Sequence, residues 1–295
     1  MLIRTGFDIA FATERDTPMM AHLSLRPERR GDMRTPEVLR TDPPVPVHQY
    51  VDGFGNLASR FVVPAGGLRL SSDFIVEDPG LIDPYAPDAE QHDVADLPDE
   101  TLIYLLGSRY CEVDLLMGEA WDIAGAVQGG WHKVQAVVDA AHERLGFNYA
   151  TASERRTARG AWDERAGVCR DFAHLAITLC RAVNIPARYC TGYLVDFAGG
   201  AFHGPMDFSA WFEAYIGGRW HPFDARHNHL RYPQMKYGRL MMALGRDATD
   251  VALTTSFGRA PLTRFEVHTN EVLTADLTRG PRETALRWNE DDPPR

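Results

Sequence analysis

Apolar and polar positions alternate along the first 80 residues, as they do in β-strands that bury one face. Phe7, Ile9 and Phe11 share one face of a predicted strand. Two later strands flank a turn-rich connection, residues 52–56, which predicts a hairpin. Residues 1–80 are therefore predicted to form an N-terminal β-rich domain.

The pattern changes after residue 80. Residues 81–97 are rich in proline and aspartate, and this composition resists both helix and sheet, so the stretch is predicted to be a linker. Apolar residues then recur at helical spacing, most clearly over residues 131–145. A core domain is predicted over residues 98–277. Residues 278–295 are charged and contain prolines, which predicts a mobile tail.

The most informative segment is residues 166–175, which contains Cys169. Phe172, Leu175 and Leu179 follow at helical spacing and predict a buried helix that begins close to this cysteine. Unpaired backbone N–H groups at a helix start favour a thiolate, so the pKa of Cys169 is predicted to be lowered. The other three cysteines lack this context and are interpreted as small buried hydrophobic residues.

A nucleophilic cysteine needs a base, and usually a group that orients the base. Residues 209–216 predict a strand, and a Gly-Gly turn then leads into a returning strand over 219–224. On a regular strand His221 and Asp224 lie on opposite faces, so they cannot form an orienting pair. His174 lies too far around its helix to serve the thiol and is interpreted as structural.

Composition limits the partners and the compartment. The chain has 295 residues, 44% hydrophobic and 24% charged, as expected of a soluble globular protein. Its net charge of −10 argues against electrostatic binding of nucleic acid or an anionic membrane. Neither a transmembrane helix nor a signal peptide is predicted. Four cysteines without a CxxC pair exclude a disulfide scaffold and a zinc ribbon, which predicts a cytoplasmic protein with reduced thiols.

Several pieces of the chain resemble the bacterial transglutaminase-like superfamily: Gly167-Val168-Cys169-Arg170-Asp171-Phe172, Ile185-Pro186-Ala187-Arg188-Tyr189, Ala210-Trp211-Phe212-Glu213 and the run from Trp220 to Asp224. Residues 52–56 resemble the β-rich domain that precedes the core in many members. The resemblance implies an α+β fold. It consists of a papain-like transglutaminase core, with a helix-borne cysteine packed on an antiparallel sheet, after an N-terminal β-sandwich-like domain.

The resemblance also implies a Cys–His–Asp triad, in which the thiol attacks an amide carbonyl and the acyl group then passes to an amine or to water. Cys169 matches the nucleophile and Asp224 matches the aspartate. The family's histidine precedes the Ala-Trp pair, and this chain has Ser209 there. A serine hydroxyl does not titrate near neutral pH. Trp162 and Trp211 are candidates for the cleft wall, or equally for the core.

Three explanations of Ser209 stay open: a natural pseudoenzyme that keeps a binding cleft, an introduced inactivating substitution, or another histidine acting as the base. His203 is the candidate for that base, although a solvated loop imidazole is the commoner interpretation. The His227-Asn228-His229 run could chelate a metal, but no third ligand has matching spacing, and a surface loop is favoured. Neither a metal nor a cofactor is expected.

The predicted function is thiol acyl transfer on peptide or protein amides, as a cysteine protease or amidase rather than a cross-linking enzyme. Activity should be weak or absent, because general base catalysis contributes about 10²–10⁴-fold and a serine forgoes it. The alternative is a non-catalytic peptide-binding or assembly module. The sequence leaves the substrate, the acyl acceptor and the oligomeric state open.

Overall fold

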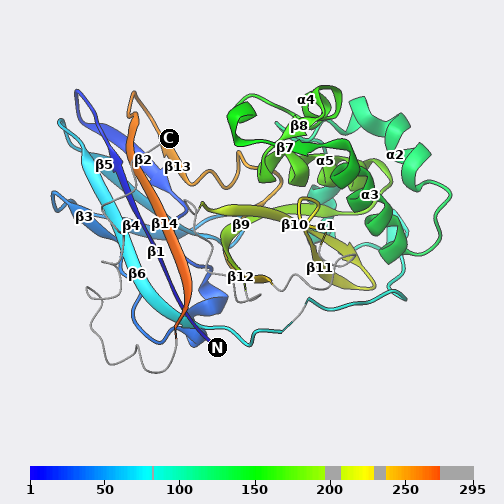
Figure 1. Cartoon of the computed structure of the whole chain (residues 1–295), viewed down its shortest axis with the longest axis horizontal. Helices are drawn as coiled ribbons and strands as arrows, with labels where there is room; N and C mark the ends of the chain where they lie inside the picture. Colours follow the sequence, from blue (N-terminus) through cyan, green and yellow to red (C-terminus); the bar gives the residue numbers. More distant parts are fainter. Residues whose placement is uncertain (82, 197–206, 229–236, 273–295) are drawn as a thin grey trace, which may run out of the picture.

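The computed structural model describes residues 1–295 except 82, 197–206, 229–236 and 273–295 (Figure 1). The predicted tail and His203 lie outside the described residues. Sandwich strands occupy one side of the molecule and helices the other, with the sheet that contains β9 and β10 next to the helices (Figure 1).

Two four-stranded antiparallel sheets, in the orders β14-β1-β6-β3 and β13-β2-β5-β4, build the β-rich part. Their apolar faces share one core, which includes Phe7, Phe61 and Phe74. The predicted hairpin is confirmed, since β4 pairs with β5 across residues 52–56. The strands that come from the N-terminal segment are β1 (Leu2–Phe11), β2 (Thr17–Ala21), β3 (Arg40–Asp42), β4 (His48–Val51), β5 (Leu57–Val63) and β6 (Leu68–Glu77).

The C-terminal strands return to this sandwich. β13 (Thr254–Ser256) pairs with β2, and β14 (Leu262–Val272) pairs with β1 along nearly its whole length. These residues fall within the predicted core domain, 98–277, but they pair with strands of the N-terminal segment. The sequence of β14 gives no local indication of this pairing, because the strand is largely polar and exposed and its partner lies at the other end of the chain.

The second part combines helices with a four-stranded antiparallel sheet in the order β11-β10-β9-β12. Its strands are β9 (Ala187–Asp196), β10 (Ser209–Ile216), β11 (Arg219–Phe223) and β12 (Tyr237–Gly245), and a short parallel pair joins β7 (Gly146–Phe147) to β8 (Ala166–Gly167). Its α-helices are α1 (Asp99–Leu102), α2 (Met117–Ala124), α3 (Gly130–Arg144), α4 (Ala158–Glu164) and α5 (Cys169–Ala182). Short 3₁₀ turns complete the chain: η1 (Pro27–Asp32), η2 (Val94–Asp96), η3 (Ile103–Leu105), η4 (Val113–Leu116) and η5 (Tyr149–Thr151).

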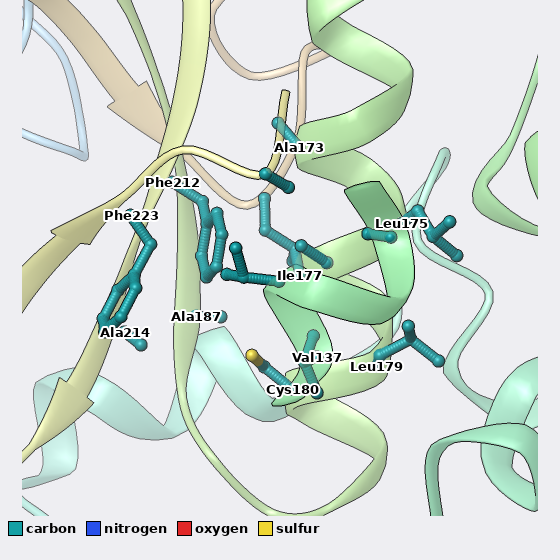
Figure 2. Close-up of a cluster of buried hydrophobic side chains, with 14 of the residues drawn as sticks. Val137, Ala173, Leu175, Ile177, Leu179, Cys180, Ala187, Phe212, Ala214 and Phe223 are labelled. Atoms are coloured by element: carbon teal, nitrogen blue, oxygen red, sulfur yellow. The ribbon is translucent and has the colours of Figure 1, made fainter. Parts of the chain in front are cut away.

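Helix α5 is the central element of this part, and every residue from 171 to 182 is buried. Ile177 and Cys180 of α5 lie in one apolar cluster with Phe212 of β10 and Phe223 of β11 (Figure 2). The two phenylalanine rings stack with centroids 5.7 Å apart. Close packing of this kind fixes the helix on the sheet, and with it the position of Cys169 relative to β10.

The two parts share apolar contacts. Tyr193 of β9 and Phe208, which precedes β10, lie in the sandwich core. The Phe208 ring is 6.2 Å from Phe7 and the Tyr193 ring is 6.4 Å from Phe74, measured between centroids. The β9–β12 sheet therefore packs on α5 and also contributes side chains to the sandwich core. The expected α+β architecture, a helix on an antiparallel sheet after a β-rich part, is confirmed.

Gly192 of β9 offers a test of this sheet. A Cβ at Gly192 would lie 2.1 Å from the backbone oxygen of Leu240 in β12, whereas a Cβ at the exposed Gly31 would meet nothing within 4 Å. We expect Gly192→Ala to lower the free energy of unfolding by about 2 kcal/mol or more, because backbone must move to make room. Gly31→Ala should leave it nearly unchanged. Urea denaturation measures the free energy of unfolding of both variants. Equal values would contradict the close approach of β9 and β12 at Gly192.

Candidate active site

Cys169 is the first residue of α5, and a tight turn presents it. Val168 is the N-cap residue in an extended conformation, and its N–H donates to Asp171 Oδ2 at 2.9 Å. This bond satisfies a backbone donor at the helix start. A Cβ on Gly167 would lie 2.6 Å from Asp171 Cβ, so only glycine fits there. The turn before Cys169 and the first turn of α5 after it therefore fix the position of the cysteine backbone.

A buried ion pair stabilises the same turn. Arg156 Nη1 lies 3.2 Å from Asp171 Oδ2, and Arg156 Nη2 lies 2.7 Å from Glu164 Oε2. The side chain of Arg156 is only 5% exposed and that of Asp171 is fully buried. Sequence reasoning missed this role for Arg156, because nothing local distinguishes it from its arginine neighbours.

The thiol of Cys169 is reduced and only partly accessible. Burial raises its pKa to about 11, and the carboxylates of Asp207 and Asp224 add to the rise. The guanidinium of Arg226 and the backbone of Ala210 act in the opposite direction. The predicted lowering of this pKa is therefore wrong: the desolvation of a thiolate outweighs the favourable helix start.

Ser209 opens β10, directly before Ala210, whose backbone lowers the pKa of the Cys169 thiol. Its side chain is buried, and within the described part of the chain its Oγ has no hydrogen-bond partner. Its backbone oxygen accepts from Thr191 Oγ1 at 3.1 Å. A serine hydroxyl is no proton acceptor near neutral pH.

Asp224 follows β11 and is buried. Its Oδ1 accepts from the backbone N–H groups of Arg226 and His227, each at 3.0 Å, and its Oδ2 lies 2.8 Å from His227 Nδ1. Although burial raises the pKa of Asp224, the His227 imidazole holds it well below its usual range. His227 is thus the imidazole bonded to the candidate triad aspartate. Its spacing of three residues from Asp224 was the available sequence signal.

Helix α3 holds the turn that carries Asp224. Asn228 is buried, with a positive φ of 47°, and its Nδ2 donates to Asp139 Oδ1 at 2.7 Å. Gln135 Nε2 donates to Asn228 Oδ1 at 3.0 Å. Nδ1 of His142 lies 3.1 Å from the backbone oxygen of Ala225. These contacts fix residues 224–228 on a rigid helix.

The remaining candidates do not converge on the thiol. Trp211 is buried in a small cluster with Tyr104, Cys190 and Leu244, so it is a core residue and not a cleft wall. Trp162 is partly buried and stacks under Arg144, whose Cζ lies 4.2 Å from its ring. Trp162 therefore packs on the core cluster, although part of it stays accessible.

The two histidines set aside on strand and helix geometry are structural. His221 is buried edge-on against Trp131, with ring centroids 5.6 Å apart, and forms no pair with Asp224. His174 is fully buried, and its Nε2 accepts from the Ala248 N–H at 3.1 Å. Burial lowers the pKa of His174 to about 3. Among the described residues, no three His, Cys, Asp or Glu side chains are grouped to hold a metal ion.

Comparison with known proteins identifies the fold. A model of the transglutaminase-like superfamily matches residues 121–225, from α2 to the turn after β11. The solved structure of a proposed cysteine protease from Cytophaga hutchinsonii is 32% identical, with a TM-score of 0.79 over 93% of this chain and 91% of that chain. The chain belongs to the transglutaminase-like superfamily. An uncharacterised protein of Mycobacterium leprae is 26% identical over 227 residues, 72% of this chain and 77% of its own length.

Membership confirms the resemblance and the expected fold. The matched transglutaminase-like segment contains Cys169, Ser209 and Asp224. The likeness to the Cytophaga protein extends beyond this segment to nearly the whole chain, including the β-rich part. No helix in the described ranges has both the length and the apolar character needed to cross a membrane.

The buried Arg156–Asp171 pair predicts a large effect of a single substitution. Arg156→Met leaves the buried Asp171 carboxylate without its main cation, and we expect the free energy of unfolding to fall by about 3 kcal/mol. Arg155→Met is the matched control, since Arg155 is exposed, and should change stability by less than about 0.5 kcal/mol. Chemical denaturation measures both, and an unchanged Arg156→Met protein would contradict the structural role.

The raised thiol pKa predicts slow alkylation at neutral pH. The iodoacetamide rate at Cys169, followed by mass spectrometry of its peptide, should rise with pH to a midpoint near the pKa of about 11. Asp207→Asn should move that midpoint down, because the Asp207 carboxylate raises the pKa of the thiol. Asp88 is exposed, so Asp88→Asn is the control and should leave the pH midpoint of alkylation unchanged. A midpoint below that of an ordinary cysteine would refute the account.

Proposed function

We propose that this chain is a thiol acyl-transfer protein of the transglutaminase-like superfamily that acts slowly on peptide amides, as a cysteine protease or amidase. One observation carries the proposal: Cys169 begins the buried helix α5, and the Asp224 carboxylate, which raises the pKa of its thiol, is bonded to the His227 imidazole at 2.8 Å. The sulfur would attack the amide carbonyl and form a thioester as the amine leaves. Water would then release the acid and restore the thiol.

Each cycle requires a proton acceptor, because the thiol is protonated at neutral pH. Ser209 cannot take that role. We assign it to His227, the imidazole that Asp224 holds. With its Nδ1–H donated to the carboxylate, the neutral ring carries its lone pair on Nε2, which is the tautomer that a general base needs.

Slow turnover follows from this arrangement. The proposed base is held by a turn after β11, whereas the family position on β10 is occupied by Ser209. General base catalysis contributes about 10²–10⁴-fold, so a base in an altered place forfeits part of that factor. The relative from Cytophaga hutchinsonii, described as a proposed cysteine protease, supports the reaction class. The free thiols support a reducing, cytoplasmic setting.

The alternative function is a non-catalytic peptide-binding or assembly module. The raised pKa of Cys169 and the serine at position 209 favour it, because both reduce the reactivity of the thiol. The two functions differ in one observable product: only the acyl-transfer protein forms a covalent thioester at Cys169.

Exposure to a peptide-amide library, followed by mass spectrometry, separates the two functions. We expect an acyl adduct at Cys169 and slow amide hydrolysis, both absent from Cys169→Ala. His227→Gln should reduce hydrolysis by about 10²-fold or more, and Ser209→His should increase it. His48→Gln, at an exposed site in β4, is the control. If the intact protein hydrolyses amides no faster than Cys169→Ala and forms no adduct, acyl transfer is rejected and the binding module is the remaining function. Unchanged activity in His227→Gln would remove His227 from the mechanism.

A further inference from the structure

Arg226 is a cation beside the thiol that the proposed chemistry does not use. It lies in the turn after β11, between Asp224 and His227, and its charge lowers the pKa of Cys169 and of Asp207. Its side chain is partly exposed. Within the described ranges it forms no ion pair with any carboxylate. An accessible guanidinium next to a nucleophile therefore has donors available for a ligand.

Aromatic side chains fix this guanidinium in place. Its Cζ lies 3.7 Å from the centre of the Phe147 ring, and its charge opposes the rise that burial causes in the pKa of Tyr149. Phe147 in turn lies 6.5 Å from Phe172 of α5, measured between ring centroids. Phe147 and Tyr149 are 37% and 54% exposed. The result is an exposed aromatic surface that packs against α5 and holds a cation whose charge acts on Cys169.

We propose that Arg226 binds a carboxylate of the substrate close to the scissile amide, so that the site prefers acidic peptides. A guanidinium matches a carboxylate with two parallel hydrogen bonds, and Phe147 and Tyr149 provide apolar area for the neighbouring peptide atoms. The carboxylate comes from an aspartate or glutamate side chain or from the chain terminus of the peptide. This inference rests on the proposed function for the place of the scissile bond, but not for binding itself.

Two carboxyl groups near Arg226 set the strength of this preference. Asp224 is compensated by His227 and by two backbone N–H groups, so it competes little for Arg226. The negative charge of Asp207 repels an acidic ligand and weakens its binding. It keeps exposed surface, and burial raises the pKa of its carboxyl. Removing the Asp207 charge should therefore strengthen the binding of acidic peptides.

The test measures binding in a protein without the thiol, Cys169→Ala. Acetylated alanine-rich hexapeptides carry one glutamate at each successive position, and each is paired with its glutamine twin. Each peptide is made twice, with a free C-terminal carboxylate and with a C-terminal carboxamide. The comparison separates recognition of a glutamate side chain from recognition of the peptide's C-terminus. We expect at least one acidic peptide to bind about fivefold or more tightly than its neutral twin. This difference should shrink as salt rises.

Variants in the same background assign the preference to one residue. Arg226→Gln should abolish it, Arg226→Lys should keep part of it, and Asp207→Asn should increase it. Arg259→Gln removes an exposed arginine between β13 and β14 and should leave it unchanged. The inference is overturned if no peptide binds, if acidic and neutral twins bind equally, or if the preference survives in a folded Arg226→Gln protein. Should Arg226→Gln not fold, full retention of affinity in Arg226→Lys overturns the two-bond recognition.

The outcomes for the two proposals are independent. An acidic preference in the thiol-free protein, without hydrolysis by the intact chain, keeps the recognition site and rejects the acyl-transfer chemistry. Hydrolysis of acidic and neutral peptides at equal rates keeps the acyl-transfer chemistry and rejects the acidic recognition site.

Discussion

The burial of α5 against the antiparallel sheet is the constraint on which the site depends. The helix is covered on all sides from residue 171 onwards, by Phe212 of β10 among others. A helix that must bury its whole circumference has little freedom to shift or rotate. Its first residue, Cys169, is therefore delivered to a fixed place beside the start of β10 and the turn after β11.

The same burial determines the chemistry of the thiol. A helix start favours a negative charge by roughly 0.3–1 kcal/mol, which corresponds to less than about one pKa unit. Desolvation can raise the pKa of a buried acid by up to about 3–5 units. For Cys169 desolvation prevails, and the carboxylates of Asp207 and Asp224 act in the same direction. The helix start therefore does not make this thiol acidic, and the proposed acyl transfer would require a proton acceptor.

Local patterns predicted the elements, but not the contacts between them. Helical spacing located α5 and its cysteine, and strand alternation correctly separated His221 from Asp224, because both patterns follow from backbone geometry alone. The pairing of β14 with β1 joins the two ends of the chain and has no local signal. The Asp224–His227 contact depends on a turn whose shape is set by α3, and the thiol pKa depends on surroundings that no motif encodes.

The turn after β11 carries both residues to which we assign a role, Arg226 in the proposed recognition and His227 in the proposed proton transfer. It carries Arg226 and His227 on consecutive residues, and the contacts of Asn228 with α3 hold both in place whether or not a base occupies position 209. Ser209 on β10 supplies no imidazole, and the guanidinium of Arg226 and its aromatic support do not depend on it. A site of this construction can lose turnover and still bind its ligand. The binding module and the slow enzyme therefore require the same turn, and they differ only in what happens at the sulfur.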